Sequence, residues 1–269
     1  MLLPTRTTTL LRPSRMPDPI RVQKALADAG VASRRGADAL VAAGRVTVNG
    51  IVAVTGQRVD PAVDALAVDG RPVVPAGTRT YLALHKPAGV TSTVSDRHAQ
   101  ETVLDLVPPD LRAARLYPVG RLDKDSEGLI LLTDDGDWTQ HLLHPRYGVE
   151  REYAIGLRAP LTVEQSQRLT EGVELDEGLA TLVSLREASR VEAARREGQR
   201  QAMLAWYHAV LTQGWKRQLR RMFAAIGAPV ARLVRVRIGT LRQGDQPPGG
   251  VRALTSAERD RLAATRSAR

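Results

Sequence analysis

A short apolar segment, Leu129–Leu132, is the sequence feature that most constrains the fold. It follows Gly128 directly and is closed by the polar run Thr133-Asp134-Asp135-Gly136. Apolar runs of this length between turn signals are typical of strands buried on both faces of a sheet. The preceding loop, PVGRLDKDSEG, carries the acidic residue Asp123 to the start of this strand. Loops held by a rigid sheet often carry binding and catalytic residues, so Asp123 is the first candidate site residue.

The charge balance favours a nucleic acid as the partner. The chain of 269 residues has a formal net charge of +10 and a pI near 10.7. Such an excess favours a polyanion, a nucleic acid before a membrane surface. Nearly all of the positive charge comes from arginine rather than lysine. Arginine suits bidentate phosphate contacts, although a GC-rich genome would produce the same excess of arginine over lysine. A chain of this length is also expected to form more than one domain.

Several kinds of site and location are excluded. The chain has no cysteine, which rules out disulfides, thiolate catalysis and cysteine-ligated metals. His141 and His144 have no third ligand at a suitable spacing, so we expect no metal, and no motif indicates a cofactor. No apolar run approaches the roughly 20 residues that span a bilayer, and residues 1–19 lack the apolar core of a secretory signal. We expect a cytoplasmic protein with a disordered tail over 1–19, or a true start at Met16.

Residues 20–70 are predicted to form a small module of two helices and a hairpin. Apolar residues over Val22–Ala29 recur at helical spacing and stop at Gly30. Ser33 is placed to cap a second helix. Alternating valines around Asn49-Gly50 predict a hairpin, and a further strand is expected at Leu66–Val68.

Four basic residues of this module form a candidate phosphate-binding surface: Lys24, Arg34, Arg35 and Arg45. Taken alone, these residues allow two interpretations: they bind a phosphate backbone, or they only make the helix pair soluble. The whole segment VQKALADAGVASRRGADALVAAGRVTVNG resembles the S-four RNA-binding domain. That resemblance implies that the four residues face RNA.

The rest of the chain is predicted to be a linker over 71–80, a catalytic domain over 81–255 and a charged, frayed helical tail over 256–269. Pro and Gly without periodicity mark the linker. Strands are expected at Tyr81–Leu84, Arg151–Leu157 and Met203–Leu211, and a charged loop at Ser189–Arg200. The fold class is therefore α+β, a helix-helix-hairpin module followed by a larger, mainly antiparallel sheet with flanking helices.

The segment Gln213–Arg242 carries eight basic residues and no acidic one. It is too apolar for disorder, and its periodicity indicates a helix followed by a strand. We interpret it as a folded basic face that requires an anionic partner.

Three segments resemble the active-site motifs of pseudouridine synthases, in the branch that modifies ribosomal RNA (the RsuA/RluB type). They are GRLDKDSEGLILLTDDG, EREYAIGL and GWKRQLRRMFAAIGAPVARLVRVRIGTL, with Lys-Pro-Ala-Gly at Lys86–Gly89 as a further match that implies a structural role for Lys86. The resemblance implies that Asp123 is catalytic, that Tyr153 stacks on the target base and that Arg220 pairs with Asp123. It implies that Arg121 supports the flipped nucleotide, and we assign Leu122, Arg217 and Arg221 to substrate binding. Gln213 and Lys216 depart from the family wording.

The resemblance implies isomerisation of a uridine in ribosomal RNA to pseudouridine, without metal or cofactor. Asp123 either attacks or deprotonates the sugar. The expected partner is ribosomal RNA, favoured as large-subunit RNA, or a pre-ribosomal particle, bound by a monomer. Two other functions stay open: an RNA methyltransferase, which lacks support because no G-x-G-x-x-G occurs, and a non-catalytic ribosome-assembly factor.

Overall fold

The computed structural model describes residues 18–74, 77–94, 101–112, 115–189, 192 and 204–265. The chain divides into two compact units, Met1–Gly77 and Thr78–Arg269. Most of the expected N-terminal tail and most of the expected charged loop at 189–200 lie outside the described residues.

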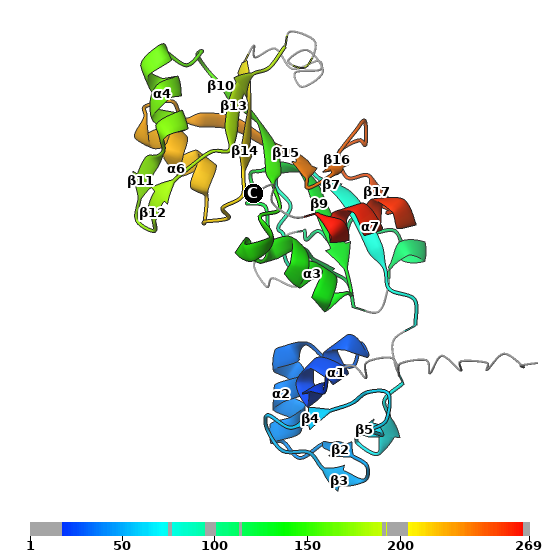
Figure 1. Ribbon diagram of the computed structural model, residues 1–269. Coiled ribbons are helices and arrows are strands. Elements are labelled where there is room, and N and C mark those ends of the chain that lie inside the picture. Colours follow the sequence, from blue (N-terminus) through cyan, green and yellow to red (C-terminus); the bar gives the residue numbers. More distant parts are fainter. Residues whose placement is uncertain are drawn as a thin grey trace, which may run out of the picture. The chain divides into compact units, whose positions relative to one another are not determined.

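The first unit is a helix pair packed on a small sheet (Figure 1). Its helices are α1 (Val22–Asp28) and α2 (Arg34–Ala42), and Ser33 caps α2 by accepting a hydrogen bond from the Gly36 amide. The four-stranded sheet has the order β3-β2-β5-β6, and β1 pairs separately with β4. The strands are β1 (Ile20–Arg21), β2 (Val46–Val48), β3 (Ile51–Val52), β4 (Arg58–Val59), β5 (Leu66–Val68) and β6 (Arg71–Pro72).

The hairpin predicted at Asn49-Gly50 is present. Both residues adopt positive φ, 51° and 81°, as a two-residue turn with the right twist for a hairpin requires. Apolar residues of α1, α2, β2 and β5, such as Leu26 and Val46, are fully buried between the helices and the sheet. The structure differs at the expected linker, because Arg71 and Pro72 pair with β5 as an edge strand.

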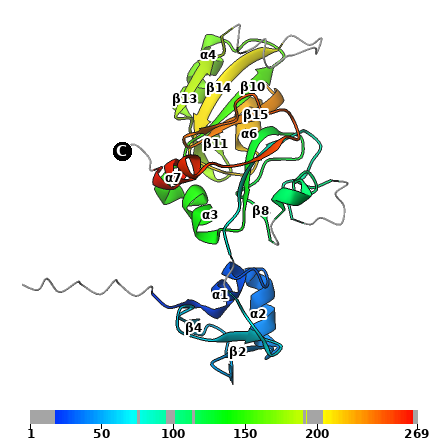
Figure 2. The same ribbon diagram turned by 90° about the vertical axis from the view of Figure 1, so that its right-hand side faces the viewer.

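The second unit is built on a nine-stranded sheet with the order β13-β14-β10-β15-β9-β7-β17, to which β8 and β16 add at β9 and β15. Figure 2 shows this sheet turned by 90°. Its strands are β7 (Tyr81–Lys86), β8 (Tyr117–Pro118), β9 (Glu127–Thr133), β10 (Arg151–Leu157), β13 (Ser184–Glu187), β14 (Ala205–Leu211), β15 (Val230–Ile238), β16 (Leu241–Arg242) and β17 (Val251–Ala253). The α+β prediction is confirmed, and strand β10 has the bounds expected from its alternation.

One pairing in this sheet is parallel, β9 with β15, and the others are antiparallel. At this crossing Gly128 faces Arg235 with φ of 107°. A Cβ atom on Gly128 would lie 2.3 Å from the Arg235 carbonyl oxygen, so no side chain fits there. The glycine thus allows two backbones to approach closely at the base of the candidate loop.

Helices and a small hairpin flank the sheet. They are α3 (Gly136–Leu143), α4 (Val163–Glu171), α6 (Gln218–Ala225) and α7 (Ser256–Ala264), with the hairpin β11 (Val173–Leu175) and β12 (Gly178–Ala180) and the 3-10 turns η1 (Pro109–Leu111) and η2 (Pro145–Tyr147). Figures 1 and 2 both show α3 beside α7. Within the described residues, no helix is long and apolar enough to cross a membrane.

The tail expected over 256–269 as a frayed helix is helical over Ser256–Ala264, but this helix is docked on the second unit. Thr255 and Glu258 form a capping box at the start of α7, and Leu262 is fully buried in a cluster with residues of β9 and α3. Because the helix buries an apolar residue and both hydrogen bonds of its capping box are formed, it is an integral part of the second unit.

Candidate active site

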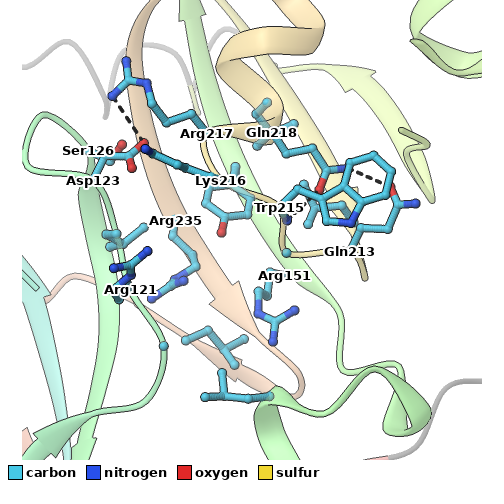
Figure 3. A pocket seen from close by; sticks show the side chains of 18 of the residues that line it. Arg121, Asp123, Ser126, Arg151, Gln213, Trp215, Lys216, Arg217, Gln218 and Arg235 are labelled. Atoms are coloured by element: carbon cyan, nitrogen blue, oxygen red, sulfur yellow. Dashed lines mark hydrogen bonds and ion pairs between the residues drawn. The ribbon is translucent and has the colours of Figure 1, made fainter. Parts of the chain in front are cut away.

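A pocket of about 630 Å³ opens beside the Asp123 loop. Its walls come from that loop, from the end of α3, from β10 and β15, and from the segment between β14 and α6. Asp123 is the one acidic residue among the described lining residues. The basic lining residues are Arg121, Arg151, Lys216, Arg217 and Arg235. In the view of Figure 3, Arg121, Arg235 and Arg151 lie below Asp123 and Lys216.

The loop carrying Asp123 is held on both sides of that residue. Before it, the Ser92 hydroxyl donates to the Leu122 carbonyl at 2.8 Å and accepts from the Leu122 amide at 3.1 Å. After it, the ammonium of Lys86 donates to the Lys124 carbonyl at 3.2 Å. Two close anchors to neighbouring peptide groups fix the direction of the intervening side chain.

Lys86 is fully buried, and its ammonium also donates to the carbonyls of Pro87 and Val90 at 2.8 and 2.7 Å. The structural role expected for Lys86 is therefore seen in its contacts. Burial lowers the pKa of Lys86 to about 8, and the charges of Glu127, Asp125 and Asp123 oppose that shift.

The lowered pKa of Lys86 predicts a pH-dependent stability. The folded state binds its proton more weakly than the unfolded chain, so the energetic penalty is complete below pH 8 and is relieved as pH rises above it. Relative to Lys86→Met, the wild-type protein should gain about 2 kcal/mol of unfolding free energy between about pH 7 and about pH 9.5. Urea unfolding of both proteins at each pH measures this difference. A pH-independent difference would contradict the lowered pKa.

The carboxylate of Asp123 faces Arg217, not Arg220. The two side chains lie 3.7 Å apart, and the Asp123 side chain is 31% exposed. Arg220 instead lies 3.1 Å from the Asp125 carboxylate and donates to the Asp125 carbonyl. The predicted Arg220–Asp123 pair is thus absent from this structure, because Arg220 is paired with Asp125. Arg217, at the N-cap of α6 with φ of 51°, lies near both carboxylates, 3.7 Å from Asp123 and 3.4 Å from Asp125.

The other predicted site residues divide into two groups. Arg121, Leu122 and Tyr153 line the pocket with Asp123, and Tyr153 is 9% exposed. Arg221 does not line it, and its Nη2 atom donates to both carboxylate oxygens of Glu177 at 2.8 Å. Its assignment to substrate binding has no support in its contacts.

Two arginines in the pocket, the buried Arg235 and the half-buried Arg151, were not singled out from the sequence as site residues. Arg235 is 3% exposed and donates from Nε to the Leu129 carbonyl at 2.7 Å. Arg151 donates to the carbonyls of Thr212 and Leu142 at 3.2 and 3.0 Å. The alternation of side chains along a strand could have identified them. It places Arg151 on the same face as Tyr153, and Arg235 on the same face as Leu233.

Much of the basic segment Gln213–Arg242 is neutralised within the chain, which corrects the expectation that the whole segment requires an external anion. Arg232 forms a bidentate pair with Glu127 at 2.8 Å. Arg237 pairs with Glu150 and Glu152 at 3.0 and 2.9 Å. The acidic partners are Glu127 of β9, Glu152 of β10 and Glu150 just before β10, all distant in sequence. The basic residues of this segment that line the pocket are Lys216, Arg217 and Arg235.

In the described part of the chain, no group of three or more histidine, cysteine or acidic residues is arranged to hold a metal ion. His141 contacts the Thr265 carbonyl at 3.0 Å, which ties α3 to the end of α7. His144 accepts a hydrogen bond from the Arg146 amide. Both histidines therefore have structural partners.

The comparison with protein families identifies the family of the second unit. The model described as RNA pseudouridylate synthase matches residues 80–225, more than half of the chain. The chain belongs to this family. Pseudouridylate synthases convert uridine in RNA to pseudouridine, and this synthase also carries an S4 domain, matched over residues 20–63.

Relatives of the synthase extend over nearly its whole length. It is 40% identical to an uncharacterised RNA pseudouridine synthase of Mycobacterium bovis, over 91% of this chain and 93% of the relative. It is 40% identical to ribosomal large subunit pseudouridine synthase B of Pseudomonas aeruginosa over 81% of this chain, and spans 55% of that protein. The synthase also resembles a crystal structure of a pseudouridylate synthase, with a TM-score of 0.60 and 25% identity over 90% of this chain and 99% of that one.

Proposed function

We propose that the synthase isomerises a specific uridine of ribosomal RNA, in the large subunit, with Asp123 as its catalytic residue. The observation that carries this proposal is the isolation of Asp123 among the described lining residues, one carboxylate in a pocket with five basic residues. Two relatives at 40% and 37% identity are named ribosomal large subunit pseudouridine synthase B. That name supports the choice of large-subunit RNA.

The reaction needs one reactive carboxylate and a space in which a base can turn. A uridine in folded RNA must leave its stack to reach the pocket. Asp123 then attacks the sugar or deprotonates it, and the N1–C1′ bond breaks. The uracil turns, C5 bonds to C1′, C5 loses a proton and N1 gains one. Tyr153 offers a ring to the extruded base, and Arg121, two residues before Asp123, is placed to support the flipped nucleotide.

The S4 domain supplies a second contact with RNA through α2. Arg34 and Arg35 are exposed in its first turn and form no ion pair within the described residues. Lys24 and Arg45 each form an ion pair within the domain, with Asp28 at 2.7 Å and with Asp69 at 2.5 Å respectively. We propose that Arg34 and Arg35 contribute most to phosphate binding and that Lys24 and Arg45 contribute less.

Replacing Arg34 and Arg35 by Ala should weaken RNA binding and flatten its salt dependence. Each lost phosphate contact lowers the slope of log affinity against log salt by about 0.7 to 0.9. A salt titration of RNA affinity measures that slope. The matched control is Arg58→Ala with Arg71→Ala, which removes the same charge from β4 and β6. Equal slope changes in both double variants would mean that net charge, not α2, determines binding.

One assay separates the proposed function from the two alternatives. The purified protein is incubated with large-subunit and small-subunit RNA transcripts without any added cofactor, and the nucleosides are analysed for pseudouridine. We expect conversion at one site in large-subunit RNA. A requirement for a methyl donor would indicate a methyltransferase, and binding without conversion would indicate an assembly factor. Mapping pseudouridine in RNA from cells lacking the protein then identifies the nucleotide.

We also propose that the synthase acts in the cytoplasm as a monomer on ribosomal RNA or a pre-ribosomal particle, without a cofactor. The proposed reaction is an isomerisation, so its atoms balance without a donor or an oxidant. Sedimentation of the protein with and without RNA measures the oligomeric state.

A further inference from the structure

The pocket contains two arginines, Arg235 and Arg151, that have no role in the proposed chemistry. Arg235 is 3% exposed, and its Nη2 atom is buried without a hydrogen-bond partner among the described residues. Its Nε is committed to the Leu129 carbonyl at 2.7 Å, so the orientation of the guanidinium is fixed. A buried donor with no acceptor is unfavourable unless a ligand supplies one.

Arg151 stands on the neighbouring strand β10 and lines the same pocket. Both of its hydrogen bonds go to backbone carbonyls, those of Thr212 and Leu142, and none goes to a carboxylate. Burial lowers the pKa of Arg151, Tyr153 opposes that shift, and the positive charge of Arg235 adds a smaller lowering. The two guanidinium groups therefore repel each other when the pocket is empty, and an anion would relieve that repulsion.

We propose that Arg235 and Arg151 bind the detached uracil as an anion, and so stabilise it while it turns. The inference rests on the proposed function. When the N1–C1′ bond breaks, its electron pair leaves with the base, which then carries one negative charge shared by N1, O2 and O4. The charge disappears when C5 bonds to C1′, N1 takes up a proton and C5 loses one.

A cation accelerates a reaction when the negative charge that it binds forms only during the reaction. The uracil ring is neutral before bond cleavage, so the two guanidinium groups interact more strongly with the detached base than with bound RNA. Their fixed hydrogen bonds to backbone carbonyls mean that little reorganisation is needed when the charge appears. Such preorganised donors commonly contribute about 10²-fold to 10³-fold to a rate.

The surroundings favour a base over a phosphate group as the source of the anionic oxygen. Apolar side chains line the pocket with the two arginines: Leu142, Leu211, Leu233 and Ile238, together with the ring of Tyr153. A flat heteroaromatic ring packs against such walls, whereas a hydrated phosphodiester would be desolvated there without compensation. The charged edge of the ring would then face Arg235.

The test compares Arg235→Gln with Arg235→Lys and with Arg168→Gln, an exposed arginine on α4 outside the pocket. Arg235→Gln should slow single-turnover conversion by about 10²-fold or more, with RNA affinity changed less than about threefold. Arg235→Lys should recover part of the rate because it keeps the charge, and Arg168→Gln should behave as wild type.

A second substrate distinguishes the two sources of anionic oxygen. In RNA with 5-fluorouridine at the target, fluorine withdraws electrons and stabilises the negative charge on the departing uracil ring. The deficit of Arg235→Gln, measured as the rate of loss of 5-fluorouridine, should then be smaller than with uridine. Equal deficits with both RNAs, or a loss of affinity with a lower salt slope, would indicate a phosphate site and overturn the proposal.

Two further measurements separate a folding defect and a failure of the proposed function from a failure of this inference. If tryptophan fluorescence shows that Arg235→Gln does not fold, Arg151→Gln carries the same comparison from the other strand. If wild-type protein converts no uridine, the proposed function fails; if it converts uridine and both Gln variants convert it at the wild-type rate, only this inference fails.

Discussion

Replacing Asp123 by Asn should reduce pseudouridine formation by on the order of 10⁴-fold or more, because the amide can neither attack the sugar nor accept its proton. RNA affinity should stay roughly unchanged, since the substitution keeps the shape of the side chain and removes no basic residue. Single-turnover conversion of an RNA fragment, with binding measured separately, gives both quantities.

Asp125→Asn is the matched control for Asp123→Asn. Asp125 lies two residues further along the same loop, is 53% exposed and faces Arg220 at 3.1 Å. It does not line the pocket, so its loss should slow conversion by less than about tenfold. If Asp125→Asn were inactive and Asp123→Asn active, the assignment would move to the carboxylate that Arg220 contacts.

Gly128→Ala should destabilise the second unit by about 3 kcal/mol or more. The new Cβ would lie 2.3 Å from the oxygen, 2.6 Å from the nitrogen and 2.9 Å from the carbonyl carbon of Arg235, all of them backbone atoms in a central strand. The φ of 107° adds strain for any residue with a side chain. The separation of β9 and β15 must therefore increase, which weakens their pairing.

Gly178→Ala separates the two causes. Gly178 has a similar φ, 120°, but no atom lies within 4 Å of the position of its Cβ. It should show the conformational strain alone, roughly 1 to 2 kcal/mol. The three tryptophans, Trp138, Trp206 and Trp215, all belong to the second unit, so their fluorescence during urea unfolding reports its stability. Equal losses in the two variants would contradict a clash at Gly128.

The sequence predicted the regular elements well where a local signal determines them. Strand β10 follows from alternation over Arg151–Leu157, and the first hairpin follows from Asn49-Gly50, whose positive φ values few other pairs adopt. The docking of α7 was missed, because a frayed helical tail was expected although Thr255 and Glu258 have the spacing of a capping box. The high charge of the segment outweighed that signal in the interpretation.

Side-chain pairing in the site could not be predicted from the sequence. Whether Arg217 or Arg220 faces Asp123 depends on the positive φ of Arg217, where the chain enters α6. No residue preference predicts an arginine in that conformation. Likewise, the acidic partners of Arg232 and Arg237 come from segments about 100 residues earlier, so the sequence shows only an unbalanced block of charge.

The central position of β15 has a practical consequence for shortened forms of the protein. The family match ends at residue 225, before this strand begins at Val230. A fragment cut at the end of the match would lose the strand that joins β10 to β9, and would expose the amides and carbonyls of both edges. Such a fragment should be recovered as insoluble material, whatever its similarity to the family. A soluble minimal synthase has to extend through α7.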